Sequence, residues 1–450
     1  MRKCLLLLLL FAIAPFAGGE SIPPPNDDSH IPRTFEVGPK MKYATIEAAY
    51  KDARPGDMVL VYPLQKDEPY LRTALIVTKP RITFIAVLVA DRRHVHIDGS
   101  GYEYSGAGSV PRAVFQFNKG ADGCVLHGFE IYNARNESSN GAAVRINEAN
   151  DITVRYCNFH DNDMGVMSNG SVTTKTAMNS RFEYCVVHGN GSEKHAGYNH
   201  NFYMGGSSVV LFGCELYEPT TGHNFKSRAH YNRIEYSYIH DSANREFDLV
   251  DADNTEAEGS HTLLLGNYIV KSSNCKGNRA VIHFGTDGGK DHKGTLYLAH
   301  NTIVTPYLSP VVDLSAPSAG AYLADNLIWD GDDRGEHTLF SVSKDAALSA
   351  VVCSNNWLSR SFSLPDGVAD ADNVFDNSTP PFADIGKHDM RLVMSRASAF
   401  HFALAPDKLM LPLEQDSPLS APDRLMQYVH PLTILIRGDF KKSYVGAGVK

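Results

Sequence analysis

Several features that mark other classes of protein are missing from this chain of 450 residues. It has no run of Lys or Arg and a formal net charge of -9 at pH 7, which argues against a nucleic acid partner. None of its seven cysteines belongs to a Cys-x-x-Cys pair, so a zinc site is not expected. Beyond the first residues, no hydrophobic run is long enough to span a membrane.

The one long hydrophobic run lies at the N-terminus. A basic start, Met1–Cys4, precedes the apolar segment Leu5–Phe16 and the small residues Ala17–Gly19. This order is typical of a cleavable signal peptide, and the apolar part is too short for a membrane span. We therefore expect residues 1–19 to be a signal peptide, residues 20–34 to be a linker, and the mature protein to be secreted or periplasmic.

A short pattern recurs along the middle of the chain. Each copy begins with a small or polar residue and continues with residues that favour β-strands, as in Cys157–His160 and Asn301–Val304. The irregular spacing between copies suits stacked coils with loops of different length. The leading positions read Cys157, Cys185, Cys214, Ser237, Asn267, Asn301, Asn326 and Asn356. Stacked coils place equivalent residues about 4.8 Å apart, which suits buried thiols and hydrogen-bonded Asn ladders.

These repeats resemble the right-handed parallel β-helix of the pectate-lyase-like superfamily over residues 35–358. The resemblance implies an all-β chain: a single-stranded right-handed parallel β-helix, or solenoid, with an N-terminal helical cap and a C-terminal capping tail over residues 359–450. The cap is expected to be a short helix, Ile46–Ala53, with Thr45 as its N-cap, followed by the strand Met58–Val61. The superfamily contains lyases, hydrolases, esterases, epimerases and adhesins, so the fold alone does not predict an activity.

The stretch Thr221–Asp251 holds the densest set of polar groups at strand spacing, and we place the candidate site there. Three successive segments align on a shared phenylalanine, at Phe202, Phe225 and Phe247. Side chains alternate across a strand, so the neighbours of an inward Phe are expected to face outward. The expected outward set is Asn201, Tyr203, Asn224, Lys226, Arg228, Glu246 and Asp248, with His283 added by the next segment and His200, His223, Asp251 and Asp253 at the flanks.

This outward set contains the groups that β-elimination of a uronic acid polymer requires. The charge of the substrate carboxylate must be neutralised before a base can remove the neighbouring C5 proton, and an acid can then protonate the departing O4. We predict that Lys226 is the base, with its pKa lowered by a nearby cation, and that Arg228 binds the carboxylate or assists the departing oxygen. Alternatives for the acid and base roles are Tyr203, His223 and His283.

Carboxylate and amide oxygens are also the ligands that Ca²⁺ prefers. The expected ligands are Asn201, Asn224, Glu246 and Asp248. We expect two further residues, His200 and Asp251, to contact the substrate.

The site resembles that of the β-helix polysaccharide lyases that include chondroitinase B and alginate lyases. Those enzymes use a Lys base, an Arg, and Ca²⁺ held by Asn and Glu, and the resemblance places these roles on Lys226, Arg228, Asn224 and Glu246. It implies a polysaccharide lyase with an acidic polysaccharide as substrate and Ca²⁺ as a cofactor. Capped β-helices are often monomers, so a monomer is expected.

Other functions are compatible with the same residues. A C5-epimerase would share the proton-abstraction step. A glycoside hydrolase would use paired carboxylates, for which Asp248, Asp251 and Asp253 are candidates, although the Asn-x-Asp and Asp-Asp signature of hydrolases with this fold is not apparent. A third class is a non-catalytic glycan-binding or surface protein.

Structural roles compete with the catalytic ones. Lys226 and Arg228 could form surface ion pairs with acidic residues of neighbouring coils. Asn201 and Asn224 could equally be turn or ladder asparagines.

Overall fold

The computed structural model describes residues 31–89, 94–306, 310–331, 335–343, 345–393, 395, 404–405, 425–436, 443–448 and 450. The expected signal peptide and most of the expected linker lie outside these residues. Short strands are the main regular structure of the described chain, and most of them form three long parallel sheets. Among the described residues, no helix combines the length and the apolar character needed to cross a membrane.

Each sheet takes one strand from each coil. Sheet A contains β1 (Thr34–Val37), β2 (Met58–Val61), β5 (Thr83–Ala86), β8 (Val125–His127), β11 (Thr153–Arg155), β14 (Ser180–Glu183), β17 (Ser208–Phe212), β20 (Tyr231–Glu235), β23 (Thr262–Leu265), β26 (Thr295–Ala299), β29 (Gly320–Ala324), β33 (Val351–Ser354) and β36 (Ala369–Ala371). Sheet B contains β3 (Tyr70–Leu71), β6 (His96–Asp98), β9 (Glu130–Tyr132), β12 (Asn158–His160), β15 (Val186–His188), β18 (Glu215–Tyr217), β21 (Tyr238–His240), β24 (Tyr268–Val270), β27 (Thr302–Thr305), β30 (Leu327–Asp330), β34 (Trp357–Ser359) and β37 (Val374–Asp376). Sheet C contains β4 (Leu75–Val77), β7 (Ala113–Asn118), β10 (Ala142–Asn147), β13 (Met164–Asn169), β16 (Phe202–Met204), β19 (Phe225–Ser227), β22 (Phe247–Val250), β25 (Ile282–Gly285), β28 (Val312–Leu314) and β32 (Phe340–Val342).

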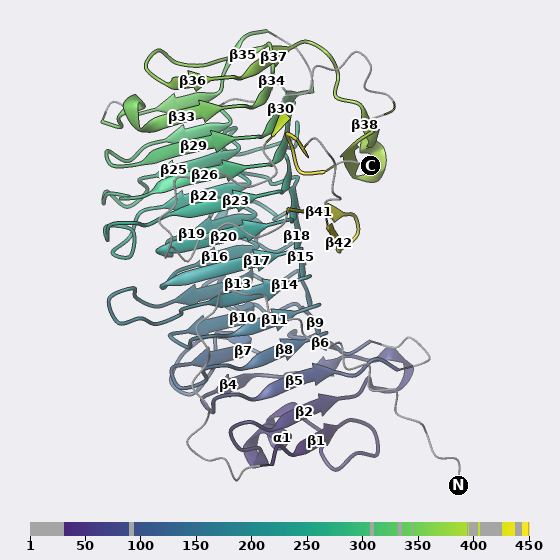
Figure 1. Ribbon diagram of the computed structural model, residues 1–450. Coiled ribbons are helices and arrows are strands. Elements are labelled where there is room, and N and C mark those ends of the chain that lie inside the picture. The colour runs from purple at the N-terminus through teal and green to yellow at the C-terminus, as the bar shows by residue number, and fades with distance from the viewer. Residues whose placement is uncertain are drawn as a thin grey trace.

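The sheets wind into a right-handed parallel β-helix, which confirms the predicted fold (Figure 1). Each strand pairs in parallel with the equivalent strands of the coils before and after it, so equivalent residues form columns along the axis. Inward columns such as Phe202, Phe225 and Phe247 stack ring on ring and fill the core. One coil could not bury these rings alone, whereas stacked coils share them.

The column of leading residues is buried, as the repeat predicted. Cys157, Cys185 and Cys214 are buried free thiols. Higher up, Asn267 donates to Asn301 Oδ1 at 3.0 Å, and the bonds continue through Asn326 and Asn356 to Asn373. The ladder therefore satisfies buried amides from coil to coil along the interior.

The N-terminal cap agrees with the prediction. Helix α1 (Ile46–Asp52) lies between β1 and β2, and the side chain of Thr45 accepts a hydrogen bond from Ala48 N at 3.2 Å. Ile46, Ala49 and Tyr50 are buried, so the helix covers the core of the first coil. The strand after it, β2, has the predicted bounds Met58–Val61.

The β-helix continues past the predicted boundary at residue 358, because β36 and β37 add another coil. One short pair, β31 (His337–Thr338) with β35 (Phe362–Ser363), precedes this coil in the chain. The pairs after it are β38 (Phe382–Asp384) with β39 (Asp389–Leu392), β40 (Leu404–Ala405) with β43 (Ser443–Tyr444), and β41 (Met426–Val429) with β42 (Thr433–Ile436). Short 3₁₀ turns cover Gln65–Asp67, Glu193–His195, Leu348–Ala350 and Ile385–Lys387.

The C-terminal tail runs along the outer face of sheet B (Figure 1). Met390, Tyr428 and Ala447 of the tail pack in one buried cluster with Tyr238 and Tyr268 of sheet B. The described part of the tail therefore packs against sheet B.

We predict that Asn301→Ala destabilises the protein, because two buried N–H groups of Asn267 lose the acceptor Oδ1. Each orphaned buried group costs roughly 1–3 kcal/mol, so the loss should be at least about 2 kcal/mol, measured by urea denaturation. Asn274→Ala, at an exposed loop position, serves as the control. Equal denaturation midpoints for the two variants would contradict a stabilising ladder.

Candidate active site

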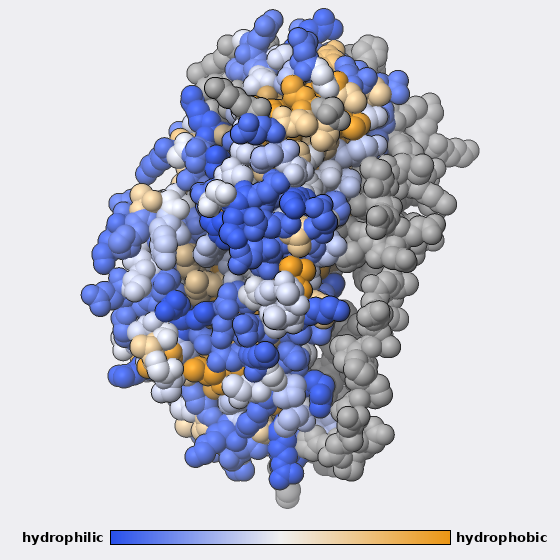
Figure 2. Space-filling model, turned by 90° about the vertical axis from the view of Figure 1, so that its left-hand side faces the viewer, coloured by the Kyte–Doolittle hydropathy of each residue, from blue (hydrophilic) through white to orange (hydrophobic). Residues whose placement is uncertain are grey.

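A column of polar residues runs along the outer face of sheet C. Tyr203, Lys226, Asp248, His283 and Asp313 stand in register on β16, β19, β22, β25 and β28. They alternate with inward residues, so all five face away from the core. Figure 2 shows that this flank of the molecule is mostly hydrophilic, with small hydrophobic patches.

Asp248 is the centre of this column, with only 2% of its side chain exposed. Its Oδ2 accepts a hydrogen bond from Lys226 Nζ at 2.7 Å and lies 3.3 Å from His223 Nε2. Its Oδ1 lies 2.9 Å from both His283 Nδ1 and Arg245 Nη1. Burial alone would raise the pKa of Asp248, but His223, His283 and Lys226 together hold it well below its ordinary value. The carboxylate is therefore ionised and fixed from four sides.

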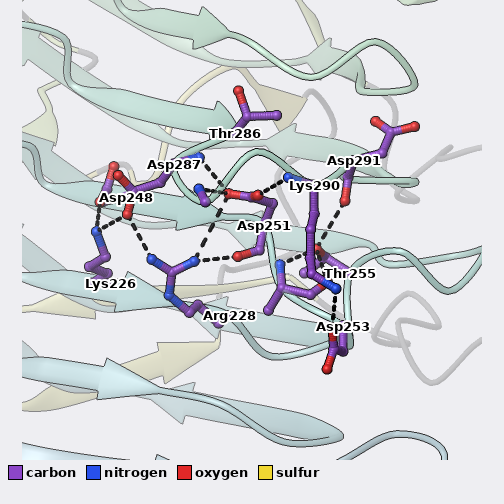
Figure 3. Close-up of polar contacts among 12 residues, drawn as sticks. Lys226, Arg228, Asp248, Asp251, Asp253, Thr255, Thr286, Asp287, Lys290 and Asp291 are labelled. Atoms are coloured by element: carbon purple, nitrogen blue, oxygen red, sulfur yellow. Dashed lines mark hydrogen bonds and ion pairs between the residues drawn. The ribbon is translucent and has the colours of Figure 1, made fainter.

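A second carboxylate bridges two cations at the mouth of the site. Asp287 Oδ2 accepts from Lys226 Nζ at 2.9 Å and from Arg228 Nη2 at 2.7 Å (Figure 3). Its side chain is 44% exposed, whereas that of Lys226 is 12% exposed. One exposed carboxylate group therefore occupies the space between an ammonium and a guanidinium group.

The prediction of a lowered pKa for Lys226 is wrong. Burial of the ammonium group does lower the pKa, but Asp248 and Asp287 outweigh this and leave it above its ordinary value. Lys226 is therefore a cation in this arrangement and not a free base.

Arg228 connects Asp287 to Tyr203. Its Nε donates to Tyr203 Oη at 3.3 Å, and its Nη1 donates to the backbone carbonyl of Asp251. About a quarter of the guanidinium side chain is exposed. The fold thus brings Tyr203, Lys226 and Arg228 to one accessible face, as the strand pattern predicted.

Asp251 anchors a loop instead of facing a substrate, which corrects the expected role. Its side chain is fully buried and accepts from the backbone N–H groups of Asp287, Gly288 and Lys290, the last two at 2.7 and 2.5 Å (Figure 3). Burial would raise the pKa of Asp251, but these donors and Arg228 hold it below its ordinary value. The buried carboxylate therefore fixes the loop that carries Asp287.

His200 and His223 lie behind the site and support it. They are 3% and 4% exposed, and their rings are tilted by 31° with centroids 5.0 Å apart. His200 Nδ1 accepts from His223 N, and His223 Nδ1 accepts from Arg245 N, both at 3.1 Å. Burial lowers the pKa of His223 to about 4 and that of His200 well below its ordinary value. His200 was expected to contact the substrate, and His223 was an alternative acid or base. Both expectations are wrong, because both rings are buried.

Asn201, Asn224 and Glu246 do not face outward, so the expected calcium ligand set is wrong. Each is fully buried, and the equivalent positions in the next coils are Val281 and Val311. Alternation holds only within a strand, and these residues precede the first strand residue, at the corner where the chain turns into sheet C.

A hydrogen-bonded ladder uses the polar atoms of this corner. Asn201 Nδ2 donates to Asn224 Oδ1 at 2.8 Å, and Asn224 Nδ2 donates to Glu246 Oε2 at 2.6 Å. The buried ammonium of Lys271 lies 3.8 Å from Glu246 Oε1. With Asp248 also engaged by cations, the residues expected to hold Ca²⁺ do not fit that ion. Within the described residues, no group of three or more His, Cys, Asp or Glu side chains could hold a metal.

Three site residues were not predicted: Arg245, Asp287 and Ser315. Arg245 immediately precedes the predicted Glu246, but its contacts with Asp248 and Asp313 depend on the corner geometry. Asp287 is 61 residues from Lys226 in the chain and reaches it only because its loop folds back over the sheet. The sequence signal was the polar, glycine-rich run Gly285–Lys290 directly after a strand.

Comparison with solved structures agrees with the fold. The chain is similar in fold to a pectate lyase. The structure, pectate lyase Pel9A, has 14% sequence identity and a TM-score of 0.51, and the match covers 93% of this chain and 96% of that one. A PL6 alginate lyase in complex with a trisaccharide has 11% identity and a TM-score of 0.32, over 77% of this chain and 97% of that one. No protein-family model matches the chain, and no curated protein does. At these identities the likeness shows the β-helix fold alone.

We predict that Asp251→Ala loosens the loop Thr286–Asp291. Removing the buried acceptor leaves the amides of Asp287, Gly288 and Lys290 without their partner. Hydrogen bonds to a charged group contribute about 1.5–3 kcal/mol, so the amides should exchange with deuterium at least about tenfold faster. Glu258→Ala, at a side chain 85% exposed that pairs with Lys293 outside this loop, is the control. Unchanged exchange in Asp251→Ala would show that the loop is held by other contacts.

Proposed function

We propose that this protein is a secreted polysaccharide lyase that cleaves a uronic-acid-containing polysaccharide by β-elimination. The observation that carries the proposal is the position of Asp287, whose exposed carboxylate lies 2.9 Å from Lys226 Nζ and 2.7 Å from Arg228 Nη2. The carboxylate of a uronic acid has the same charge and shape and would bind the same two cations. The similar fold of a protein named as a pectate lyase accords with such a substrate.

The two cations supply the first requirement of β-elimination. Removing the C5 proton places negative charge on the adjacent carboxylate group, and Lys226 and Arg228 would stabilise that charge in a partly buried site. The raised pKa of Lys226 suits this role and that of an acid toward the departing O4.

Tyr203 is the base in this proposal. It stands next to Lys226 in the outward column, and its hydroxyl oxygen accepts a hydrogen bond from Arg228 Nε. This hydrogen bond holds the hydroxyl group on the same face as the two cations that would bind the substrate carboxylate. His223 is buried, and His283 is held by Asp248 and Ser315, so neither is as well placed.

The hydrolase alternative has less support. A glycoside hydrolase needs one carboxylic acid with a raised pKa facing a second carboxylate. The pKa values of Asp248 and Asp251 are both held low, and both side chains are buried. A C5-epimerase would remove the same C5 proton as the lyase. The two activities differ in their product, which is an inverted C5 centre for the epimerase and an unsaturated sugar for the lyase.

We predict that the mature protein forms unsaturated products from at least one acidic polymer among pectate, alginate, chondroitin sulfate, dermatan sulfate, heparin and ulvan. The measurement is ultraviolet absorbance from new C4=C5 double bonds, with Ca²⁺ and with chelator. Tyr203→Phe and Lys226→Ala should each lower the rate at least about 100-fold, because each removes an acid, a base or charge stabilisation.

Lys293→Ala is the control, because this cation pairs with Glu258 at the surface. Its rate should equal that of the unchanged protein. New reducing ends without absorbance would instead favour a hydrolase. Inverted C5 configuration without new double bonds or new reducing ends would favour an epimerase.

We also predict that Asp287→Asn binds the identified uronic acid oligomer more tightly. The substitution keeps the shape of the side chain and removes the charge that competes for Lys226 and Arg228. A charged hydrogen bond is worth about 1.5–3 kcal/mol, so the dissociation constant should fall roughly tenfold. Asp253→Asn makes the same charge change at an exposed position and is the control in calorimetry. Equal or weaker binding by Asp287→Asn would remove Asp287 as a competitor.

A further inference from the structure

A chain of hydrogen-bonded polar groups begins one coil above Lys226, at Asp248, and continues over the next two coils. Ser315 Oγ is 2.7 Å from His283 Nε2, and His283 Nδ1 is 2.9 Å from Asp248 Oδ1. A hydroxyl, an imidazole and an ionised carboxylate therefore form one continuous chain of hydrogen bonds. This order and these distances are those of a nucleophile, its base and the group that orients the base.

Successive coils supply the three groups. Asp248 is on β22, His283 is the next residue of the same outward column on β25, and Ser315 directly follows β28. Asp248 and His283 are buried, whereas Ser315 is partly exposed. The base is therefore shielded from water, and the hydroxyl is the member of the chain that a ligand can reach.

Gly285 permits the contact between Ser315 and His283. A Cβ atom at position 285 would overlap Ser315 Oγ and would lie 2.7 Å from Ser315 N. Only a residue without a side chain lets the hydroxyl fold back against β25.

The hydrogen bonds fit one tautomer of His283. With the proton on Nδ1, the ring donates to Asp248, and Nε2 accepts from the hydroxyl of Ser315. The backbone N–H of Thr286 donates to Ser315 Oγ at 2.8 Å, which leaves the hydroxyl proton free to point at His283. This is the state in which an imidazole can remove the proton of a serine hydroxyl.

We propose that Ser315, His283 and Asp248 form a catalytic triad that hydrolyses acyl esters. Ser315 Oγ attacks the ester carbonyl carbon while its proton moves to His283 Nε2. The bond from the acyl carbon to the alkoxy oxygen breaks, and that oxygen takes the proton from His283. Water then attacks the acyl carbon and gives a proton to His283 Nε2. The bond from the acyl carbon to Ser315 Oγ breaks, Oγ takes the proton from His283, and a carboxylic acid leaves.

Backbone amides beside the hydroxyl complete the proposed centre. The N–H of Thr286 already points at Ser315 Oγ, and Ala316 N lies 2.8 Å from where a Cβ of residue 285 would be. These two N–H groups are the candidate donors to the developing oxyanion. The proposed substrate class is an O-acylated sugar of the polymer, and only this choice of alcohol rests on the proposed lyase function.

The test uses the mature full-length protein with p-nitrophenyl acetate as the ester and a fluorophosphonate probe as the serine label. We expect ester hydrolysis and a single label on Ser315, located by peptide mass spectrometry. Ser315→Ala should lower kcat/KM for the ester about 1,000-fold and abolish labelling. Ser318→Ala, at an exposed serine of the same loop, should keep both.

The labelling experiment needs no variant, so it keeps the proposal testable even if Ser315→Ala misfolds. Absence of label on Ser315, or ester hydrolysis equal in Ser315→Ala and the unchanged protein, would overturn the triad. The absorbance assay on acidic polymers is run in parallel on the unchanged protein. Ester hydrolysis without double-bond formation would support the triad and contradict the lyase. Double-bond formation without ester hydrolysis would support the lyase and contradict the triad.

Discussion

The buried carboxylate of Asp248 is the group on which the rest of the site depends. An ionised carboxylate with 2% of its side chain exposed is stable only when charged or hydrogen-bonding partners surround it. Lys226, His223, His283 and Arg245 meet that requirement, and in doing so they are held in place. The fixed spacing between coils makes this possible, since each coil brings its residue to within one strand spacing of the carboxylate.

The charges of the site are balanced in the absence of a substrate. Lys226 is shared by Asp248 and Asp287, and Arg228 is bound by Asp287 and by the carbonyl of Asp251. Asp248 is buried and cannot leave, whereas Asp287 is exposed and lies on a loop anchored at its base by Asp251. An incoming carboxylate would therefore displace the side chain of Asp287 and leave the rest of the site unchanged. Such an arrangement keeps two cations partly desolvated without leaving either of them unpaired.

The fold was predictable from the sequence because its signal is repeated. A Cys, Ser or Asn at the head of each strand, such as Cys185 and Asn326, is required by a buried column, and many copies make the pattern visible. The final coil was not predicted, because Asn373 follows Asn356 at a shorter interval than the earlier repeats. Asn373 nevertheless continues the same hydrogen-bonded ladder.

The site was predictable only where strand alternation applies. Tyr203, Lys226 and Asp248 lie inside paired strands, and the shared Phe fixed their direction. Asn224 and Glu246 lie at the corner before the strands, where the chain turns and alternation no longer decides direction. The raised pKa of Lys226 also escaped prediction, because one of its two carboxylate partners comes from a loop far along the chain.

The most direct test of the account is a crystal structure of the protein with a bound uronic acid trisaccharide. The account predicts that one sugar carboxylate contacts Lys226 Nζ and Arg228 Nη2, with C5 of that sugar facing Tyr203 Oη and the side chain of Asp287 turned away. A trisaccharide bound elsewhere, with Asp287 still bridging the two cations, would contradict it.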